Sequence, residues 1–161
     1  MMVRDQTPAD RDAVSGLVSA AFGQADEARL VQALLKAGDG VISLVAEEQD
    51  AMLGHVLLSR MEAPLRALAL APLAVAPARQ GRGIGAALVR AAIERARGAG
   101  WEAVFVLGDG AYYERFGFDA AAAAGFSSPY AGPHFMVLAL TATLAASTGE
   151  LRHAPAFAAL G

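Results

Sequence analysis

Residues 73–88 read Leu73-Ala74-Val75-Ala76-Pro77-Ala78-Arg79-Gln80-Gly81-Arg82-Gly83-Ile84-Gly85-Ala86-Ala87-Leu88, and they decide the fold of this chain. An apolar, strand-like run ends at Val75 and a helical pattern begins near Ile84. The turn between them is rich in arginine and glycine. Glycine adopts positive φ at no steric cost and lets a partner approach the backbone closely. The stretch therefore predicts a strand, an open turn and a helix.

The open turn is suited to a phosphate group. The first N–H groups of a helix have no partner within the helix, and the helix N-terminus carries a partial positive charge. Such a terminus binds phosphate or pyrophosphate. The turn lacks both the lysine and the hydroxyl of a P-loop, and its glycine spacing differs from that of a dinucleotide fold. The alternative is a plain strand-to-helix turn whose glycines only permit tight packing.

A second motif follows the apolar run Ala103–Leu107 and reads Tyr112-Tyr113-Glu114-Arg115-Phe116-Gly117-Phe118. With the first motif before it, the chain resembles the GCN5-related N-acetyltransferase (GNAT) superfamily over about residues 3–140. The family's turn for the pyrophosphate of acetyl-CoA, Gln/Arg-x-x-Gly-x-Gly/Ala, is matched by Gln80, Gly83 and Gly85. A Tyr-x-x-x-Gly-Phe segment is matched by Tyr113, Gly117 and Phe118. With Gly108-Asp109-Gly110 before it, this segment resembles a bacterial subgroup with undefined substrates.

The resemblance implies an α+β fold, an α/β/α sandwich with a mixed, mostly antiparallel sheet flanked by helices. We expect a single N-acetyltransferase domain over residues 1–161, with a core over 3–140 and a C-terminal extension over 141–161. Pro72 removes a ladder donor from its strand, which indicates a bulge or an edge irregularity. In the family a bulge splays this strand, and the resemblance implies that the main-chain N–H of Leu73 or Val75 binds the pantetheine arm and polarises the acetyl carbonyl.

Local patterns predict the other elements. Thr7 and Asp10 read as a capping box before a first helix, and Asp26 reads as the N-cap of a second helix. The expected strands cover 3–5, 41–47, 54–61, 66–75, 103–107 and 134–140, and a short helix covers 111–116. In the extension we expect 149–153 to form an extra strand or a contact in a homodimer, with 155–157 in a tail. Residues 120–125 and 127–130 read as a loop over the substrate end.

Composition excludes several classes of protein. The 161 residues fit one compact domain, and a mean hydropathy of +0.39 excludes a disordered chain. No uninterrupted apolar run reaches the roughly 20 residues that cross a bilayer. The N-terminus lacks a signal-peptide core, so we expect a cytoplasmic protein with no membrane partner. The net charge of −3 gives no basic footprint for nucleic acid.

The composition indicates neither a metal site nor a thiol nucleophile. It contains no cysteine, and its three histidines are far apart without the spacing of metal ligands. We therefore expect no metal site. An acyl group would pass directly from a thioester to an acceptor.

The resemblance implies an acetyl-CoA-dependent N-acetyltransferase that transfers acetyl directly to an amine. The acceptor stays open: a small molecule, an amino acid, an antibiotic or a peptide N-terminus. Tyr113 takes the family position of the acid that assists thiolate departure, and its alternative role is a packing aromatic. Tyr112 is expected to pack. The predicted cofactor-binding residues are Leu73, Ala74, Val75, Arg79, Gln80, Gly81, Arg82, Gly83, Ile84, Gly85 and Ala86.

The sequence alone does not identify the general base. No carboxylate lies in residues 68–73, where many relatives place one. The candidates are Glu27, His55, Glu62 and Asp109, of which Asp109 also reads as a helix cap, and a water chain would serve as well. Two other functions stay open: an acyl-CoA-binding sensor module without catalysis, and a structural protein independent of CoA.

Overall fold

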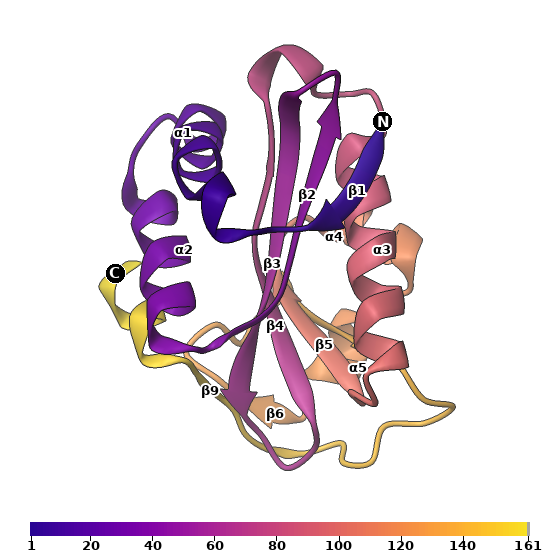
Figure 1. The fold of residues 1–161 in the computed structure, drawn as a ribbon. Helices are drawn as coiled ribbons and strands as arrows, with labels where there is room; N and C mark the ends of the chain where they lie inside the picture. Colours follow the sequence, from indigo (N-terminus) through magenta and orange to yellow (C-terminus); the bar gives the residue numbers. More distant parts are fainter. Residues whose placement is uncertain (161) are drawn as a thin grey trace.

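The computed structural model describes residues 1–160 of the chain. Three long helices and a central sheet form most of it (Figure 1). The helices are α1 (Arg11–Phe22), α2 (Asp26–Ala37), α3 (Ile84–Gly98), α4 (Gly110–Tyr113) and α5 (Ala120–Ala123). The strands are β1 (Met2–Asp5), β2 (Gly40–Glu48), β3 (Ala51–Glu62), β4 (Ala67–Val75), β5 (Ala103–Leu107), β6 (Phe126–Ser127), β7 (Phe135–Ala139), β8 (Gly149–Glu150) and β9 (Arg152–His153).

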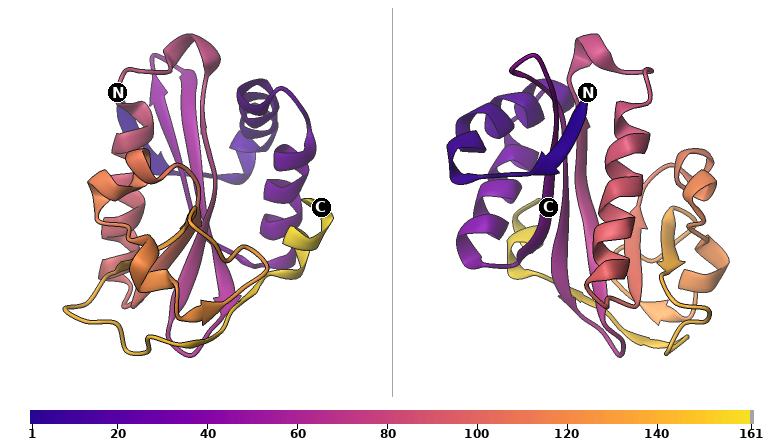
Figure 2. Two further views of the ribbon diagram at one scale, coloured as in Figure 1. Left: turned by 180° about the vertical axis from the view of Figure 1, so that it is seen from behind. Right: turned by 45° about the vertical axis from the view of Figure 1, so that its right-hand side comes forward.

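The sheet has seven strands and lies between two helical layers. Six strands follow the order β1-β2-β3-β4-β5-β7, and β9 pairs with the far end of β3. β4 and β5 run parallel, and the other pairs of this sheet are antiparallel. Helices α1 and α2 cover one face and α3 covers the other (Figure 2). The expected α+β sandwich with a mostly antiparallel sheet is confirmed.

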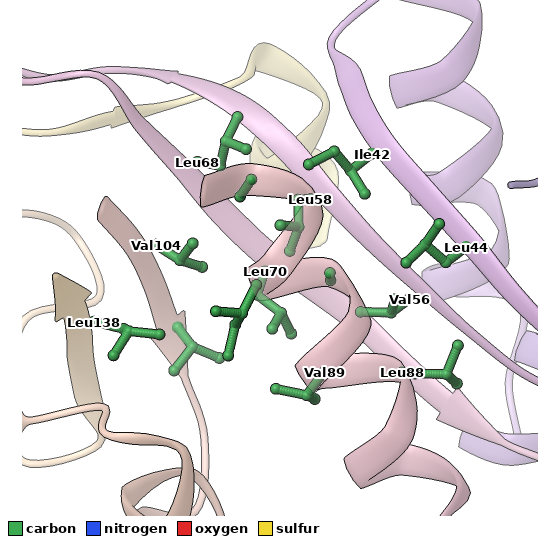
Figure 3. Packing of buried hydrophobic residues seen from close by; sticks show 14 of the residues in the cluster. Ile42, Leu44, Val56, Leu58, Leu68, Leu70, Leu88, Val89, Val104 and Leu138 are labelled. Carbon is green, nitrogen blue, oxygen red and sulfur yellow. The ribbon is translucent and has the colours of Figure 1, made fainter. Parts of the chain in front are cut away.

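Alternation along the strands builds a core on each face of the sheet. Side chains that alternate along a strand point to opposite faces. One set packs against α3, and the opposite set packs against α1 and α2. The α3-side cluster includes Ile42, Leu44, Val56, Leu58, Leu68, Leu70, Leu88, Val89, Val104 and Leu138 (Figure 3). This cluster holds α3 against the centre of the sheet, and with it the turn that precedes α3.

β4 has a bulge at Pro72, as the sequence predicts. Val56 lies opposite Leu73 and Leu58 lies opposite Leu70, so one residue of β3 faces two residues of β4, Ala71 and Pro72. The bulge is therefore confirmed. The bulge lies where pairing with β5 has ended, so β4 also has a free edge at Pro72.

β4 and β5 separate beyond the bulge. They pair from Ala67 opposite Ala103 to Leu70 opposite Val106, and no further. The end of β4 from Leu73 onward stays paired with β3, while β5 continues beside β7. The sheet thus opens between two of its central strands, at the end that leads into the glycine turn.

The two N-terminal helices begin in different ways. The Thr7 amide donates to Asp10 Oδ2 at 2.8 Å, as the capping box predicts, and a 3₁₀ turn precedes α1. The guanidinium of Arg4 and the Thr7 amide hold the pKa of Asp10 well below its usual range. The prediction for α2 is wrong by one residue: Ala25 is the N-cap and Asp26 is the first helical residue.

The C-terminal extension folds back onto the domain. In β9, Arg152 lies opposite Glu62 and His153 lies opposite Met61 of β3, so the expected extra strand is confirmed. The expected tail at 155–157 is wrong. Residues Pro155–Leu160 form a 3₁₀ helix packed on α2, because Phe157 is buried in the α1–α2 cluster. The predicted loop at 120–125 also differs, since Ala120–Ala123 forms the helical turn α5.

His55 is an internal histidine of β3. Its side chain is fully buried, and Nε2 lies 2.9 Å from Ser43 Oγ and 3.1 Å from Gln6 Oε1. Nδ1 is buried without a hydrogen-bond partner among the described residues. Burial disfavours the charged imidazolium and lowers the pKa of His55 to about 4. The imidazole is therefore neutral in the folded protein near neutral pH.

We expect His55 to make stability depend on pH. In the unfolded chain it takes up a proton near pH 6.5, whereas the folded protein resists protonation down to about pH 4. The unfolded state thus binds more protons in this range, and the free energy of unfolding falls by about 1–3 kcal/mol as the pH drops through it. Urea unfolding at several pH values measures the slope, which should decrease in His55→Gln.

The exposed His134 supplies the matched control, since His134→Gln should leave the slope unchanged. His153 keeps its own share of the dependence, because burial lowers its pKa as well. The Asp10 carboxyl loses its stabilising effect only below its unfolded pKa of about 3.9, outside this range. The same slope in His55→Gln as in the parent protein would contradict the prediction.

Candidate active site

The N-terminus of α3 presents unpaired backbone donors. Gly83, the N-cap, has a φ of +82°, a conformation that glycine adopts without strain. The first helical bond runs from the Ala87 N–H to the Gly83 carbonyl at 3.0 Å. The N–H groups of Ile84, Gly85 and Ala86 therefore lie in the first turn without a partner in the helix. Three consecutive donors and a partial positive charge meet at one point.

A cavity of about 540 Å³ opens in front of these donors. We call it the α3 cavity. It is lined by Leu73, Val75, Arg79, Gln80, Gly81, Gly83, Ile84, Gly85, Ala86, Asp109, Tyr112, Tyr113 and Arg115. The structure thus brings most of the predicted cofactor-binding residues together with Tyr113. Ala74 and Arg82 are the two predicted residues that do not line it.

The end of β4 turns two amides toward the opening in the sheet. The Ala76 N–H donates to the Leu53 carbonyl of β3 at 2.8 Å. Bonding directions alternate along an antiparallel pair, so the backbone of Ala74 also faces β3. The N–H groups of Leu73 and Val75 therefore point away from β3, into the space that β5 has left.

Side chains complete the wall around the glycine turn. Gln80 Nε2 donates to the Val75 carbonyl at 3.2 Å, which ties the turn to the end of β4. Arg115, which the sequence reasoning missed, places its guanidinium 4.5 Å from the ring centre of Tyr112. Its Nε donates to the Tyr112 carbonyl at 3.1 Å. Arg79 and Arg115 thus add positive charge to the cavity.

Tyr113 is held by close packing. Its ring meets Phe118 edge to face, with centres 5.7 Å apart. A Cβ on Gly108 would lie 2.6 Å from Tyr113 Cε2, so only glycine leaves room for the ring. Burial raises the pKa of Tyr113 to about 12, with a further contribution from Tyr112. The phenol is therefore a neutral proton donor at physiological pH.

Tyr112 packs, as expected, and also lines the cavity. It meets Tyr113 edge to face with centres 5.0 Å apart, and Phe116 at 5.5 Å. A Cβ built on Gly85 would lie 2.6 Å from its hydroxyl, so the tip of Tyr112 lies over the first turn of α3. The two motifs of the sequence therefore touch in space.

The four candidate bases are dispersed. Asp109 lines the α3 cavity and also caps α4, where Oδ1 accepts from the Ala111 amide at 3.1 Å. Glu27 accepts from Gln24 Nε2 at 3.1 Å at the start of α2. Glu62 is exposed at the end of β3, and His55 is internal. Of the four, Asp109 alone lines the α3 cavity.

A smaller cavity of about 140 Å³ lies beside the separation of β4 and β5. We call it the C-terminal cavity. It is lined by Ala69, Leu70, Ala71, Phe105, Val106, Leu107, Tyr130, His153, Phe157 and Leu160. Four of these lining residues were not predicted as site residues: Tyr130, His153, Phe157 and Leu160. The available signal was the occurrence of Leu151, His153 and Phe157 in a segment otherwise rich in small residues.

Two kinds of feature are not found in residues 1–160. No group of three or more His, Cys, Asp or Glu side chains there is arranged to hold a metal ion. Within the same range no helix has the length and apolar character needed to cross a membrane.

Comparison with known proteins identifies the family. The model of the acetyltransferase (GNAT) family matches residues 11–118. Uncharacterized N-acetyltransferase YjhQ of Escherichia coli K12 is 40% identical over 146 residues, covering 82% of this chain and 80% of that protein. YhbS of the same strain, also named an uncharacterized N-acetyltransferase, is 33% identical over 126 residues, covering 76% of this chain and 75% of that protein.

Solved structures agree. A crystal structure of Escherichia coli YhbS in complex with CoA has a TM-score of 0.93 at 30% identity, covering 99% of this chain and 93% of that one. A GNAT family acetyltransferase from Brucella melitensis in complex with acetyl-CoA has a TM-score of 0.84 at 34% identity, covering 97% of each chain. With the splayed sheet and the glycine turn, these matches show that the chain belongs to the acetyltransferase (GNAT) family.

Proposed function

We propose that the protein is an acetyl-CoA-dependent N-acetyltransferase that transfers acetyl directly to an amine. One observation carries the proposal: the unpaired amides of α3 and the phenol of Tyr113 line the same cavity, at the opening between β4 and β5. Relatives crystallised with CoA or acetyl-CoA support this use of the cavity.

The residues of the α3 cavity fit acetyl-CoA. The amides of Ile84, Gly85 and Ala86 would hold the pyrophosphate, as helix N-termini do. A Cβ added at Gly81 or Gly83 would project into open space, so the turn leaves its backbone accessible. Arg79, Arg82 and Arg115 would add charge around the phosphates, although Arg82 does not line the cavity.

The amide donors of β4 lie further along the same path. A thioester between β4 and β5 would place its carbonyl near the free N–H groups of Leu73 and Val75. Donors fixed in advance at the point where negative charge develops lower the barrier of acyl transfer. The bulge thus supplies catalysis through the backbone.

Acetyl transfer forms one C–N bond and breaks one C–S bond. The amine nitrogen bonds to the acetyl carbon while the C–S bond breaks, and CoA leaves as a thiolate. The nitrogen loses a proton to a base, and the thiolate takes one from the Tyr113 phenol. No sulfhydryl of the protein takes part, because the chain has no cysteine. The acyl group would therefore pass to the amine without a thioester on the protein.

Introducing a carboxylate at the turn should weaken the binding of acetyl-CoA. The Gly83→Asp side chain would enter open space in front of the α3 donors and repel the phosphates. We expect the Kd for acetyl-CoA, measured by titration calorimetry, to rise at least about tenfold, since like charges in a binding site cost a kcal/mol or more.

Gly23→Asp provides the matched control. Gly23 also has a positive φ and open space around it, but it ends α1, outside the α3 cavity. Backbone strain and added charge are thus alike in the two variants. Equal Kd values for acetyl-CoA in both would remove the turn from the binding site.

Removing one hydroxyl should separate chemistry from binding. Tyr113→Phe keeps the ring against Phe118 but deletes the proton donor. General acids contribute about 10²–10⁴-fold, so we expect kcat to fall by about 100-fold with an unchanged Kd for acetyl-CoA. Stopped-flow detection of the released thiol measures kcat.

Tyr112→Phe is the control for this variant, since it removes a neighbouring hydroxyl of the same cavity. We expect kcat to change less than about threefold, the size of a lost weak hydrogen bond. The parent enzyme should show no alkaline loss of kcat from Tyr113 below about pH 12. If Tyr113→Phe turned over as fast as the parent, the phenol would be a packing residue.

A further inference from the structure

The two cavities adjoin across the opening in the sheet. β4 lines the C-terminal cavity with Ala71 and the α3 cavity with Leu73. After β5, Leu107 belongs to the first cavity and Asp109 to the second. Two residues of extended chain span about 7 Å, so a group passing between the strands from one cavity reaches the other.

The lining of the C-terminal cavity is apolar. Most of its lining residues are Ala, Leu, Val and Phe, and its polar side chains in the described chain are those of Tyr130 and His153. No Asp, Glu, Lys or Arg is among the lining residues. Leu107 is 53% exposed, although it ends a strand whose other side chains are buried. An apolar group placed in this cavity would cover it.

His153 is one of the two polar residues in this lining, with Tyr130. Its ring meets Tyr130 with centres 4.8 Å apart and Phe157 at 5.2 Å, both edge to face. Nδ1 is buried and has no hydrogen-bond partner in residues 1–160, so a ligand in the cavity would reach the ring through Nε2. Burial lowers the pKa of His153, so the ring is neutral near pH 7 and keeps one nitrogen as a hydrogen-bond acceptor.

Resting on the N-acetyltransferase function proposed above, we propose that the C-terminal cavity is the acceptor site. It takes a primary amine that carries an uncharged aromatic or branched aliphatic group, and His153 accepts a hydrogen bond from the amine nitrogen. Aromatic and aliphatic walls bind such a group, and a single neutral acceptor orients its polar end.

The same lining rejects acceptors with several positive charges. A second ammonium in the cavity would be removed from water without a carboxylate to pair with it, which is strongly unfavourable. Glu150 lines a separate surface cavity rather than this one, and there it forms an exposed ion pair with Arg152 Nε at 2.9 Å. Polyamines and aminoglycosides therefore lack the acidic wall that their charges require.

His153 also fits the proton transfer of the reaction. The amine reacts as the free base, after its ammonium form has lost one proton to solvent. As the nitrogen bonds to the acetyl carbon and the C–S bond breaks, the second nitrogen proton passes to the imidazole. The thiolate takes its own proton from Tyr113, so each proton has a donor and an acceptor on opposite sides of the opening. The four base candidates from the sequence are not needed for this step.

A panel of amines tests the acceptor class. The full-length protein with saturating acetyl-CoA would be assayed for thiol release with benzylamine, isopentylamine, methylamine and spermidine. We expect kcat/KM for benzylamine and isopentylamine to exceed that for methylamine and spermidine at least tenfold, because only they fill the apolar lining. Preference for spermidine or methylamine would overturn the inference while leaving the N-acetyltransferase function standing.

The histidine is tested separately. His153→Gln should raise the KM for benzylamine about fivefold to tenfold, the effect of a lost hydrogen bond, and lower kcat as well. His134→Gln, an exposed histidine outside both cavities, should change neither. The calorimetric Kd for acetyl-CoA should stay unchanged in both variants, which shows that they are folded.

The two proposals fail in different ways. If His153→Gln kept parental KM and kcat for benzylamine, His153 would be a packing residue and the role assigned to it would be wrong. If acetyl-CoA bound but no amine released thiol, the transferase function itself would fail, and the acceptor site with it. If acetyl-CoA did not bind the parent protein, the assignment of the α3 cavity as the acetyl-CoA site would be wrong.

Discussion

The parallel pairing of β4 and β5 stops after Leu70 and Val106, and the rest of the structure depends on that interruption. If the β4–β5 ladder continued, each N–H group of β4 that faces β5 would be hydrogen-bonded to β5. Pro72 lacks an N–H, and the bulge beside it changes which backbone groups face β5. Backbone donors are thereby left free in the centre of a sheet, where they are normally paired. Those donors make the opening a place for a polar carbonyl.

Close packing keeps the N-terminus of α3 aligned with this opening. A Cβ on Gly54 of β3 would lie 2.8 Å from Leu88 Cδ1 and 3.1 Å from Ile84 Cγ2, so only glycine lets α3 lie this near the sheet. The hydroxyl of Tyr112 covers Gly85 from the other direction. The two ends of the site are therefore positioned by rigid elements. Little movement of the backbone is needed to join them.

Local signals predicted the strand, turn and helix around the glycine turn well, because each of these features depends on neighbours in sequence. The glycine turn, the bulge at Pro72 and the Asp109 cap lie within a few residues of their causes. The C-terminal cavity depends on contacts between distant segments, such as His153 with Tyr130 and Phe157 with α2. No local pattern shows that residues 155–160 return to the domain. For the same reason no local pattern singles out His153.

The return of the C-terminal segment builds one wall of the C-terminal cavity. Tyr130, His153 and Phe157 lie beyond the 11–118 region that the family model matches. Substitutions there would reshape one wall of a cavity while the cofactor turn and the bulge stayed intact. Related proteins could then acquire different acceptors through drift in a short terminal segment, with the catalytic backbone inherited unchanged. The end of the chain, rather than its most recognisable motif, is where divergence of specificity should be sought.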